Sequence, residues 1–365
     1  MAVLESPVSR SRVLWVDIIR AVSAFGVIFT HVTMIIVNYW DKKPLVRGDE
    51  AWWTISVFYA FLARSALGLF FMISGYLLLP AATDTISFLR KRLWKLLVPL
   101  AFWGTFYLFW RGEVPADPVK AVKFILSALA SGETEFHLWF LYTFIGIYLF
   151  VPTISVVIRY GRESDVWYYV AVWFLLGPIF GFIYWTMGNY IALTQFGYFS
   201  GFIGFFLLGY LLARFNLAPK WIAAICFLLP LWAAAETWGF HRLTRIEKVM
   251  PEQWFDTLTV FVVPYTALMF LALKGLGQRI QARLAASSKV SAVWEALSRA
   301  SLGIILIHVF VLEIMYKGFG DIHLAPYDFN PALSIPIVSI VSYLICFTLV
   351  YAIQRVPILK NIVAS

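Results

Sequence analysis

Residues 13–37 read VLWVDIIRAVSAFGVIFTHVTMIIV, an apolar run whose ionisable residues are Asp17, Arg20 and His31. About 20 mainly apolar residues are enough for a helix to cross the hydrocarbon core of a bilayer. Two arginines precede the run, as in a secretory signal peptide, but the run is too long for one and has no small-residue cleavage site. We therefore interpret residues 13–37 as an uncleaved first transmembrane helix.

The composition of the whole chain extends this interpretation. Of the 365 residues, 61% are hydrophobic and only 13% are charged, whereas about 25% of the residues in soluble domains are charged. This shortage of charge excludes a soluble enzyme, a disordered segment and a nucleic-acid-binding module, despite the net charge of +9. We expect an all-α, polytopic integral membrane protein that forms one domain over residues 1–365.

Apolar runs bounded by charged residues, proline or glycine predict about ten transmembrane helices. Most of the 29 Lys and Arg residues then fall on the side that holds the N-terminus. The positive-inside rule therefore places both terminal tails, about 1–12 and 354–365, in the cytoplasm. The expected spans are 13–37, 52–79, 93–110, 137–157, 166–185, 198–213, 219–236, 255–273, 300–316 and 333–353.

The stretches between the spans are expected to be mostly short. The inner stretch 274–299 is interpreted as a basic amphipathic helix on the membrane surface, with Arg279, Arg283 and Lys289 outside an apolar stripe. Both cysteines lie within apolar runs, so we expect neither a structural disulfide nor a cysteine metal site. The longer outer stretches, interpreted as loops, are 38–51, 111–136 and 237–254.

Ionisable side chains within a membrane are costly and are therefore candidates for function. In the first span His31 follows Arg20 by eleven residues, which brings it back to within about 20° of Arg20 and roughly 16 Å further along the helix. Asp17 shares this face. These three residues form a stripe along one face of the helix and fit a functional site there. An Asp–Arg pair at the inner interface and a hydrogen-bonded histidine would also explain them.

The second span carries Arg64 near its middle, followed by the string FFMISGYLL at 70–78. An arginine at this depth has to face the interior of the bundle or an aqueous cavity. A buried carboxylate partner would be the purely structural explanation. We expect this long run to tilt or to break near Gly68 or Gly75, and Gly75 would allow another backbone to approach closely.

The string FLRKRLWKLLVP at 88–99 places Arg90, Arg92 and Lys95 at the inner mouth of the third span. Arg92 and Lys95 are three residues apart and share a helical face. Arginine binds phosphate through bidentate hydrogen bonds and lysine through a point charge, so the cluster suits a phosphate-rich ligand. Basic residues at an inner mouth also serve simply to set topology.

Further polar side chains lie in the later spans. The HLWF string puts His137 and Trp139 at a membrane interface, where such residues are typical of an aromatic belt. The SLGIILIH string ends on His308 in mid-span, and Glu313 follows five residues later on a different face. Asp256, at the outer start of the eighth span, is a candidate partner for either residue, and equally an ordinary interface residue.

Taken in order, these strings resemble the membrane acyltransferase-3 family from about residue 13 to residue 353. Each string alone is a weak signal, whereas five in the same order are specific. Lys95 in place of a second arginine offers phosphate a point charge instead of a bidentate fork, and Gly68 stands where relatives often have proline. The matching features are the Arg20–His31 spacing, FFMISGYLL, the string at 88–99, HLWF and SLGIILIH.

The resemblance implies transfer of an acyl group, usually acetyl from cytoplasmic acetyl-CoA, to a hydroxyl of an exported or lipid-linked glycan at the bacterial inner membrane, without a metal. It makes His31 catalytic and Arg20 essential, and we assign to Asp17 the ordering of the stripe. The donor site is assigned to Arg90, Arg92, Lys95 and Ser74. The substrate site is assigned to Arg64, His137, Trp139, Asp256, His308 and Glu313.

The expected mechanism is acid–base chemistry. Histidine is the commonest general base in enzymes, and burial favours the neutral imidazole that a base requires. We expect His31 to deprotonate the glycan hydroxyl, which attacks the thioester directly; a relay through acylated His31 is the alternative. The expected partners are the acyl-CoA donor, the glycan acceptor and membrane lipids, with no nucleic acid, and the oligomeric state is left open.

Two other classes of protein also place ionisable residues within a membrane. A transporter or flippase would use them as a substrate or proton path, but we find no inverted repeat and no paired broken helices in the sequence. An assembly partner of a glycan-export system would use them only to lock helices together. Loss of acylation in a folded His31→Ala variant would separate the enzyme from both.

Overall fold

The computed structural model describes residues 13–38, 50–81, 84–187, 201–247, 251–284, 289–318 and 323–363. All regular elements within these ranges are helices, as the composition predicted. Eight helices or helix combinations are long and apolar enough to cross a membrane. The prediction of an all-α, polytopic membrane protein is therefore confirmed.

The eight candidate spans are single helices or helices joined end to end. The single helices are α1 (Leu14–Val37), α4 (Thr85–Arg111), α11 (Pro219–Glu247), α13 (Lys289–Lys317) and α14 (Pro331–Arg355). The joined spans are α2 (Glu50–Ala63) with α3 (Ala66–Leu78) and η1 (Leu79–Ala81); η2 (Phe136–Leu138) with α6 (Trp139–Tyr160); and α7 (Glu163–Phe174) with the π-helical turn η3 (Leu175–Ile179) and α8 (Phe180–Met187). The short turns η5 (Glu252–Phe255) and η6 (Lys360–Val363) lie outside these spans.

Two of the ten expected spans take a different form. The run at 198–213 contains α10 (Ile203–Leu212), whose 10 residues rise only about 15 Å. The run at 255–273 corresponds to α12 (Val262–Arg283), whose C-terminal half is polar from Lys274 onward. The tail 1–12, most of the stretch 38–51 and the first residues of the run at 198–213 lie outside the described residues.

The connecting stretches hold more helix than the sequence predicted. The stretch 111–136 contains a further helix, α5 (Pro118–Ser131), and α11 continues into the stretch 237–254. The prediction of a separate surface helix at 274–299 is wrong. Helix α12 continues to Arg283, and α13 already begins at Lys289. Backbone hydrogen bonds can continue a helix beyond its apolar run, so hydropathy alone does not mark where a helix ends.

The long second run breaks at Arg64 and Ser65, and not at the glycines that the sequence suggested. Gly75 lies inside α3 against α10, where an added Cβ would be 1.8 Å from the carbonyl oxygen of Phe206. Gly209 meets α3 in the same way, 2.1 Å from the carbonyl oxygen of Met72. The glycines therefore bring two backbones together, as small residues do in membrane helix pairs.

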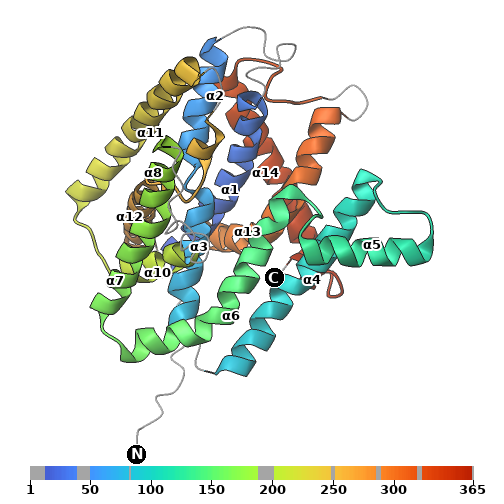
Figure 1. Ribbon diagram of the computed structural model, residues 1–365, viewed down its shortest axis with the longest axis horizontal. Helices are drawn as coiled ribbons and strands as arrows, with labels where there is room; N and C mark the ends of the chain where they lie inside the picture. The colour runs from blue at the N-terminus through green and yellow to red at the C-terminus, as the bar shows by residue number, and fades with distance from the viewer. Residues whose placement is uncertain are drawn as a thin grey trace, which may run out of the picture.

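Helix α1 is the centre of the bundle. It packs against α2, α3, α12, α13 and α14, while α11 and α12 lie on one side and α4, α5 and α6 on the other (Figure 1). The side chains of Ile19, Ala24, Ile28 and Val32 of α1 are completely buried. The apolar side chains of α1 are thus enclosed by the helices that surround it.

Candidate functional site

Three histidines from three separate elements meet beside α1. His31 comes from α1, His137 from η2 and His308 from the middle of α13. The ring centroids of His31 and His308 are 4.9 Å apart, and those of His137 and His308 are 5.1 Å apart. His308 is completely buried and His137 nearly so. The structure thus brings together the histidines of the first span, the HLWF string and the SLGIILIH string.

Backbone carbonyls fix the orientation of two of these rings. His308 Nδ1 lies 2.7 Å from the carbonyl oxygen of Ile305, and His137 Nε2 lies 3.3 Å from that of Leu306. A carbonyl only accepts hydrogen bonds, so each of these nitrogens carries the proton. His308 Nε2 and His137 Nδ1 are buried and have no hydrogen-bond partner among the described residues. Each neutral ring therefore keeps one unused acceptor nitrogen.

His31 faces a cavity of about 500 Å³ between α1, the α2–α3 break, η2 and the turn before α12. A second cavity, of about 640 Å³, lies between α2, α11 and α14. We assign the site to the first cavity because of its chemistry and not its size. Its predicted site residues are His31, Arg64, His137, Trp139 and Asp256.

Arg64 reaches this cavity from the break between α2 and α3. Its guanidinium lies over the ring of Phe255, 5.3 Å from the centroid, and its Nε is buried with no hydrogen-bond partner among the described residues. Two carboxylates, Asp256 and Glu236, act on it electrostatically. Asp256 is exposed and accepts a hydrogen bond from the backbone N–H of Leu258 at 3.0 Å.

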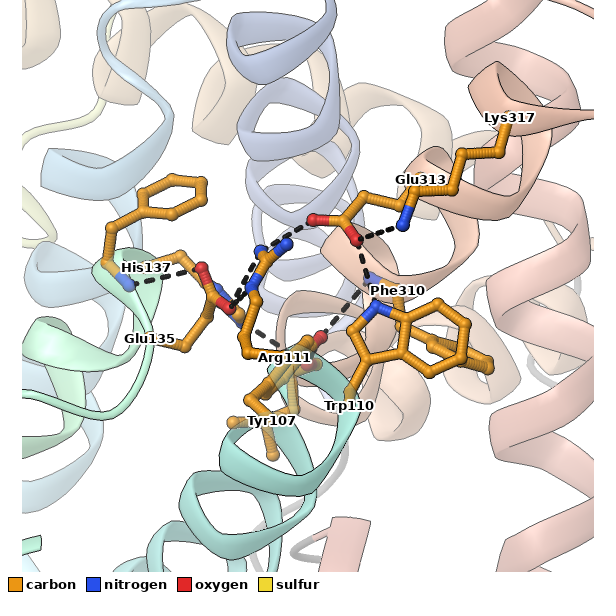
Figure 2. Close-up of polar contacts among 10 residues, drawn as sticks. Tyr107, Trp110, Arg111, Glu135, His137, Phe310, Glu313 and Lys317 are labelled. Atoms are coloured by element: carbon orange, nitrogen blue, oxygen red, sulfur yellow. Dashed lines mark hydrogen bonds and ion pairs between the residues drawn. The ribbon is translucent and has the colours of Figure 1, made fainter. Parts of the chain in front are cut away.

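The turn that carries His137 is tied down by an arginine at the end of α4 (Figure 2). Arg111 Nε donates to Glu135 Oε2 at 3.0 Å, and Arg111 Nη2 lies 2.9 Å from the same oxygen. Arg111 Nη2 also lies 2.5 Å from Glu313 Oε1 on α13. One guanidinium therefore joins the end of α4 to Glu135, which directly precedes the turn η2 that carries His137, and to α13, which carries His308.

Neighbouring groups complete this network (Figure 2). Trp110 Nε1 donates to Glu313 Oε2 at 2.9 Å, and Lys317 Nζ lies 3.8 Å from the same carboxylate. Tyr107 donates its hydroxyl proton to the carbonyl oxygen of Leu306 at 2.9 Å. Burial raises the pKa of Glu135, and the nearby Arg111 opposes this shift. Glu313 therefore has its partners on α4 and within α13.

The basic cluster lies at the other end of α1, near the start of α4. Arg90 and Lys95 are exposed and Arg92 is half-buried. Arg20 of α1 interacts electrostatically with Lys95, so it adds a fourth cation to this group. Eleven residues separate Arg20 from His31, about 16 Å along the helix. The cluster and the histidines thus lie at opposite ends of one stripe.

Two other predicted residues lie within helices α1 and α3. Asp17 is nearly buried on α1, three residues before Arg20. Ser74 is half-buried and donates a hydrogen bond to the carbonyl oxygen of Phe70 at 2.8 Å within α3. This hydrogen bond therefore holds the Ser74 hydroxyl against its own helix.

Sequence reasoning missed three residues of the site. Arg111 and Glu135 lie in a stretch read as a loop, where charges are ordinary, and Glu236 lies at the end of the seventh expected span. Glu236 is nearly buried and accepts a hydrogen bond from Trp232 Nε1 at 2.5 Å. A carboxylate inside an apolar run was the signal that would have found Glu236.

The fold and the cavity together describe a polytopic membrane protein whose site is lined by histidine, arginine and carboxylate side chains. Among the described residues, no group of three or more His, Cys, Asp or Glu side chains is arranged to hold a metal ion. A model of the acyltransferase-3 family, described as an acyltransferase domain, matches residues 13–351. The chain belongs to this family and is a membrane acyltransferase. Comparison with curated proteins and with solved structures gave no match.

Proposed function

We propose that this acyltransferase moves an acetyl group from cytoplasmic acetyl-CoA to a hydroxyl of a lipid-linked or extracytoplasmic glycan. The observation that carries the proposal is the meeting of His31, His137 and His308 beside a cavity, about 16 Å along α1 from a basic cluster. Acetyl-CoA suits these two ends, because a long arm separates its phosphates from the reactive carbonyl of its thioester. Both chain termini are proposed to face the cytoplasm.

The basic cluster is proposed to hold the donor's phosphates. Arg90, Arg92 and Lys95 lie within two turns of α4, and Arg20 is near enough to add its charge. Arginine forks and lysine point charges both stabilise phosphate oxygens. Ser74 is proposed to line the path of the arm.

His31 is proposed as the general base. It removes the proton from the acceptor hydroxyl, the oxygen attacks the thioester carbonyl, and the C–S bond breaks as the tetrahedral intermediate collapses. The leaving thiolate then takes the proton from His31, so that the neutral base is restored. Asp17 and Arg20 are three turns away and are proposed to order the donor.

His308 is proposed to orient His31. Its Nδ1 donates to Ile305, so its unused Nε2 is free to accept the N–H of the neighbouring His31 ring. The other nitrogen of His31 would then face the substrate as an acceptor. His308→Gln puts an amide oxygen near the Nε2 position, whereas His308→Asn puts its amide near the Nδ1 position. We expect His308→Gln to retain more kcat than His308→Asn, and the reverse order would refute this role.

The acceptor is proposed to enter the cavity past Arg64, Trp139 and Asp256, with His137 at its wall. Glu313 is proposed to act indirectly, through Arg111. The HLWF string and the chain length resemble the bacterial O-acetyltransferase that modifies enterobacterial common antigen. A related glycan in a bacterial inner membrane is therefore the first acceptor to test.

The test uses purified protein in liposomes, radiolabelled acetyl-CoA and an extract of lipid-linked glycans. We expect incorporation by the parent protein, no incorporation by His31→Ala, and near-parental incorporation by His323→Ala. His323 is a matched control because it lies outside the cavity and pairs with Asp328 at 3.1 Å. Transfer that survives in His31→Ala would refute the assigned base. Label trapped on His31 without acceptor would instead support the covalent relay.

A further inference from the structure

Helix α5 is a complete helix outside the eight candidate spans. Asp117 caps its first turn by accepting a hydrogen bond from the backbone N–H of Lys120 at 2.8 Å, and proline occupies its first position. Gly132 ends it with a φ of 81°, a left-handed conformation that favours glycine. The helix lies at a steep angle to α4 and α6, at the edge of the bundle (Figure 1).

One side of α5 packs on the protein. Ala128 is buried, and Leu129 lies against Gly104 of α4, where an added Cβ would come within 2.7 Å of Leu129 Cδ2. Tyr142 of α6 donates its hydroxyl proton to the carbonyl oxygen of Leu129 at 2.7 Å. This side fixes the helix to α4 and α6.

A second side of α5 is apolar and exposed. Val119, Val122 and Leu126 are 65%, 58% and 62% exposed. At about 100° per residue these three side chains fall within an arc of about 60°. The exposed polar side chains of Lys120 and Lys123 lie next to this arc. The helix therefore has a protein-facing side, an apolar outer stripe and a basic face.

We propose that α5 lies in the plane of the membrane interface. The stripe of Val119, Val122 and Leu126 would enter the region between lipid headgroups and acyl chains, and Lys120 and Lys123 would contact lipid phosphates. A basic amphipathic helix with a polar face and an apolar face is bound by lipid in this way. The occupant of the exposed stripe is thus the lipid surface, and not a partner protein.

The neighbouring end of α4 supports this placement. Phe109 and Trp110, in its last turn, are 61% and 38% exposed. Exposed aromatic side chains gather at the headgroup level of membrane proteins. Because α5 follows α4 after a short connection and packs on it, the aromatic turn and the apolar stripe are at the same edge of the bundle.

The experiment places an environment-sensitive NBD fluorophore on adjacent positions of the full-length protein. Val122→Cys and Lys123→Cys are compared in a Cys226→Ser background, since Cys226 is exposed whereas Cys346 is buried and protected from labelling. The labelled proteins are reconstituted into vesicles of phosphatidylcholine and phosphatidylglycerol. Emission and quenching by aqueous iodide and by shallow or deep nitroxide lipids are then measured.

We expect the probe at position 122 to emit at shorter wavelength, with iodide quenching several-fold weaker than at position 123 and with strongest quenching by the shallow nitroxide. Equal iodide access at the two positions would refute the proposal, because the helix would then lie in water. Strongest quenching by the deep nitroxide would refute an in-plane helix. Protection from iodide and from both nitroxides would assign the stripe to a second copy instead.

A Leu126→Cys variant repeats the test on the same stripe if Val122→Cys folds poorly. The readout requires neither acetyl-CoA nor an acceptor. The proposal therefore stands or falls independently of the proposed acyl transfer.

Discussion

The Arg111 network offers the sharpest test of how the histidines are held in place. Removing the guanidinium with Arg111→Met leaves Glu135 without its partner, and the Glu135 side chain is only 5% exposed. Breaking a buried pair by removing one member costs about 3–5 kcal/mol. Arg111 is 32% exposed, so water screens part of this loss, and we expect about 2 kcal/mol.

The coupling is measured with a double-mutant cycle. Arg111→Met, Glu135→Leu and the double variant are unfolded reversibly by SDS in mixed micelles, and the three changes in unfolding free energy are compared. The double variant leaves no unpaired charge at position 135, so we expect it to lose about 2 kcal/mol less than the sum of the single variants.

A second cycle provides the control. Glu313 keeps Trp110 and Lys317 as partners when Arg111 is removed, so coupling between Arg111→Met and Glu313→Gln should be smaller. Additive effects of Arg111→Met and Glu135→Leu would refute the reasoning, because the pair would then contribute nothing. A larger coupling to Glu313 than to Glu135 would show that the network is centred on α13.

Three further predictions address packing and the donor. Gly75→Ala should destabilise the protein by about 1–3 kcal/mol or more, since the added Cβ would meet the backbone of Phe206. Gly146→Ala should be tolerated, because the space around Gly146 is open. Equal unfolding midpoints for the two variants would contradict this prediction. Tyr107→Phe removes a buried hydroxyl that bonds to two backbone groups of α13 and should cost about 1–2 kcal/mol, measured by the same SDS unfolding. Arg92→Ala should raise KM for the proposed donor, acetyl-CoA, with little change in kcat, and an unchanged KM would argue against the proposed donor site in the basic cluster.

Hydropathy predicted where the membrane helices lie better than where they end. Apolar runs are a property of the sequence alone, and they located the eight candidate spans. Helix ends depend on capping and on tertiary contacts, so α5 and the extension of α11 were missed. Hydropathy also failed to place the break at Arg64. Gly68 and Gly75, at which the sequence predicted a break, instead allow α3 to pack closely on α10.

The candidate site was predictable where a polar residue interrupts an apolar run. His31, Arg64 and His308 stand out for this reason, and the structure places all three at or beside one cavity. Arg111 and Glu135 gave no such signal, since each lies among other polar residues and their contact joins positions 24 residues apart. Their importance comes from packing between α4 and α13, which hydropathy does not encode.

The separation of charges explains how histidines can remain neutral in this site. Glu135 and Glu313 pair with Arg111, while Asp256 and Glu236 act on Arg64. His137 and His308 donate instead to uncharged carbonyls of α13. A carboxylate beside an imidazole would favour the protonated ring, which cannot accept a proton. The arginines keep the carboxylates occupied, which fits the neutral imidazoles that the proposed general-base role of His31 and the proposed orienting role of His308 require.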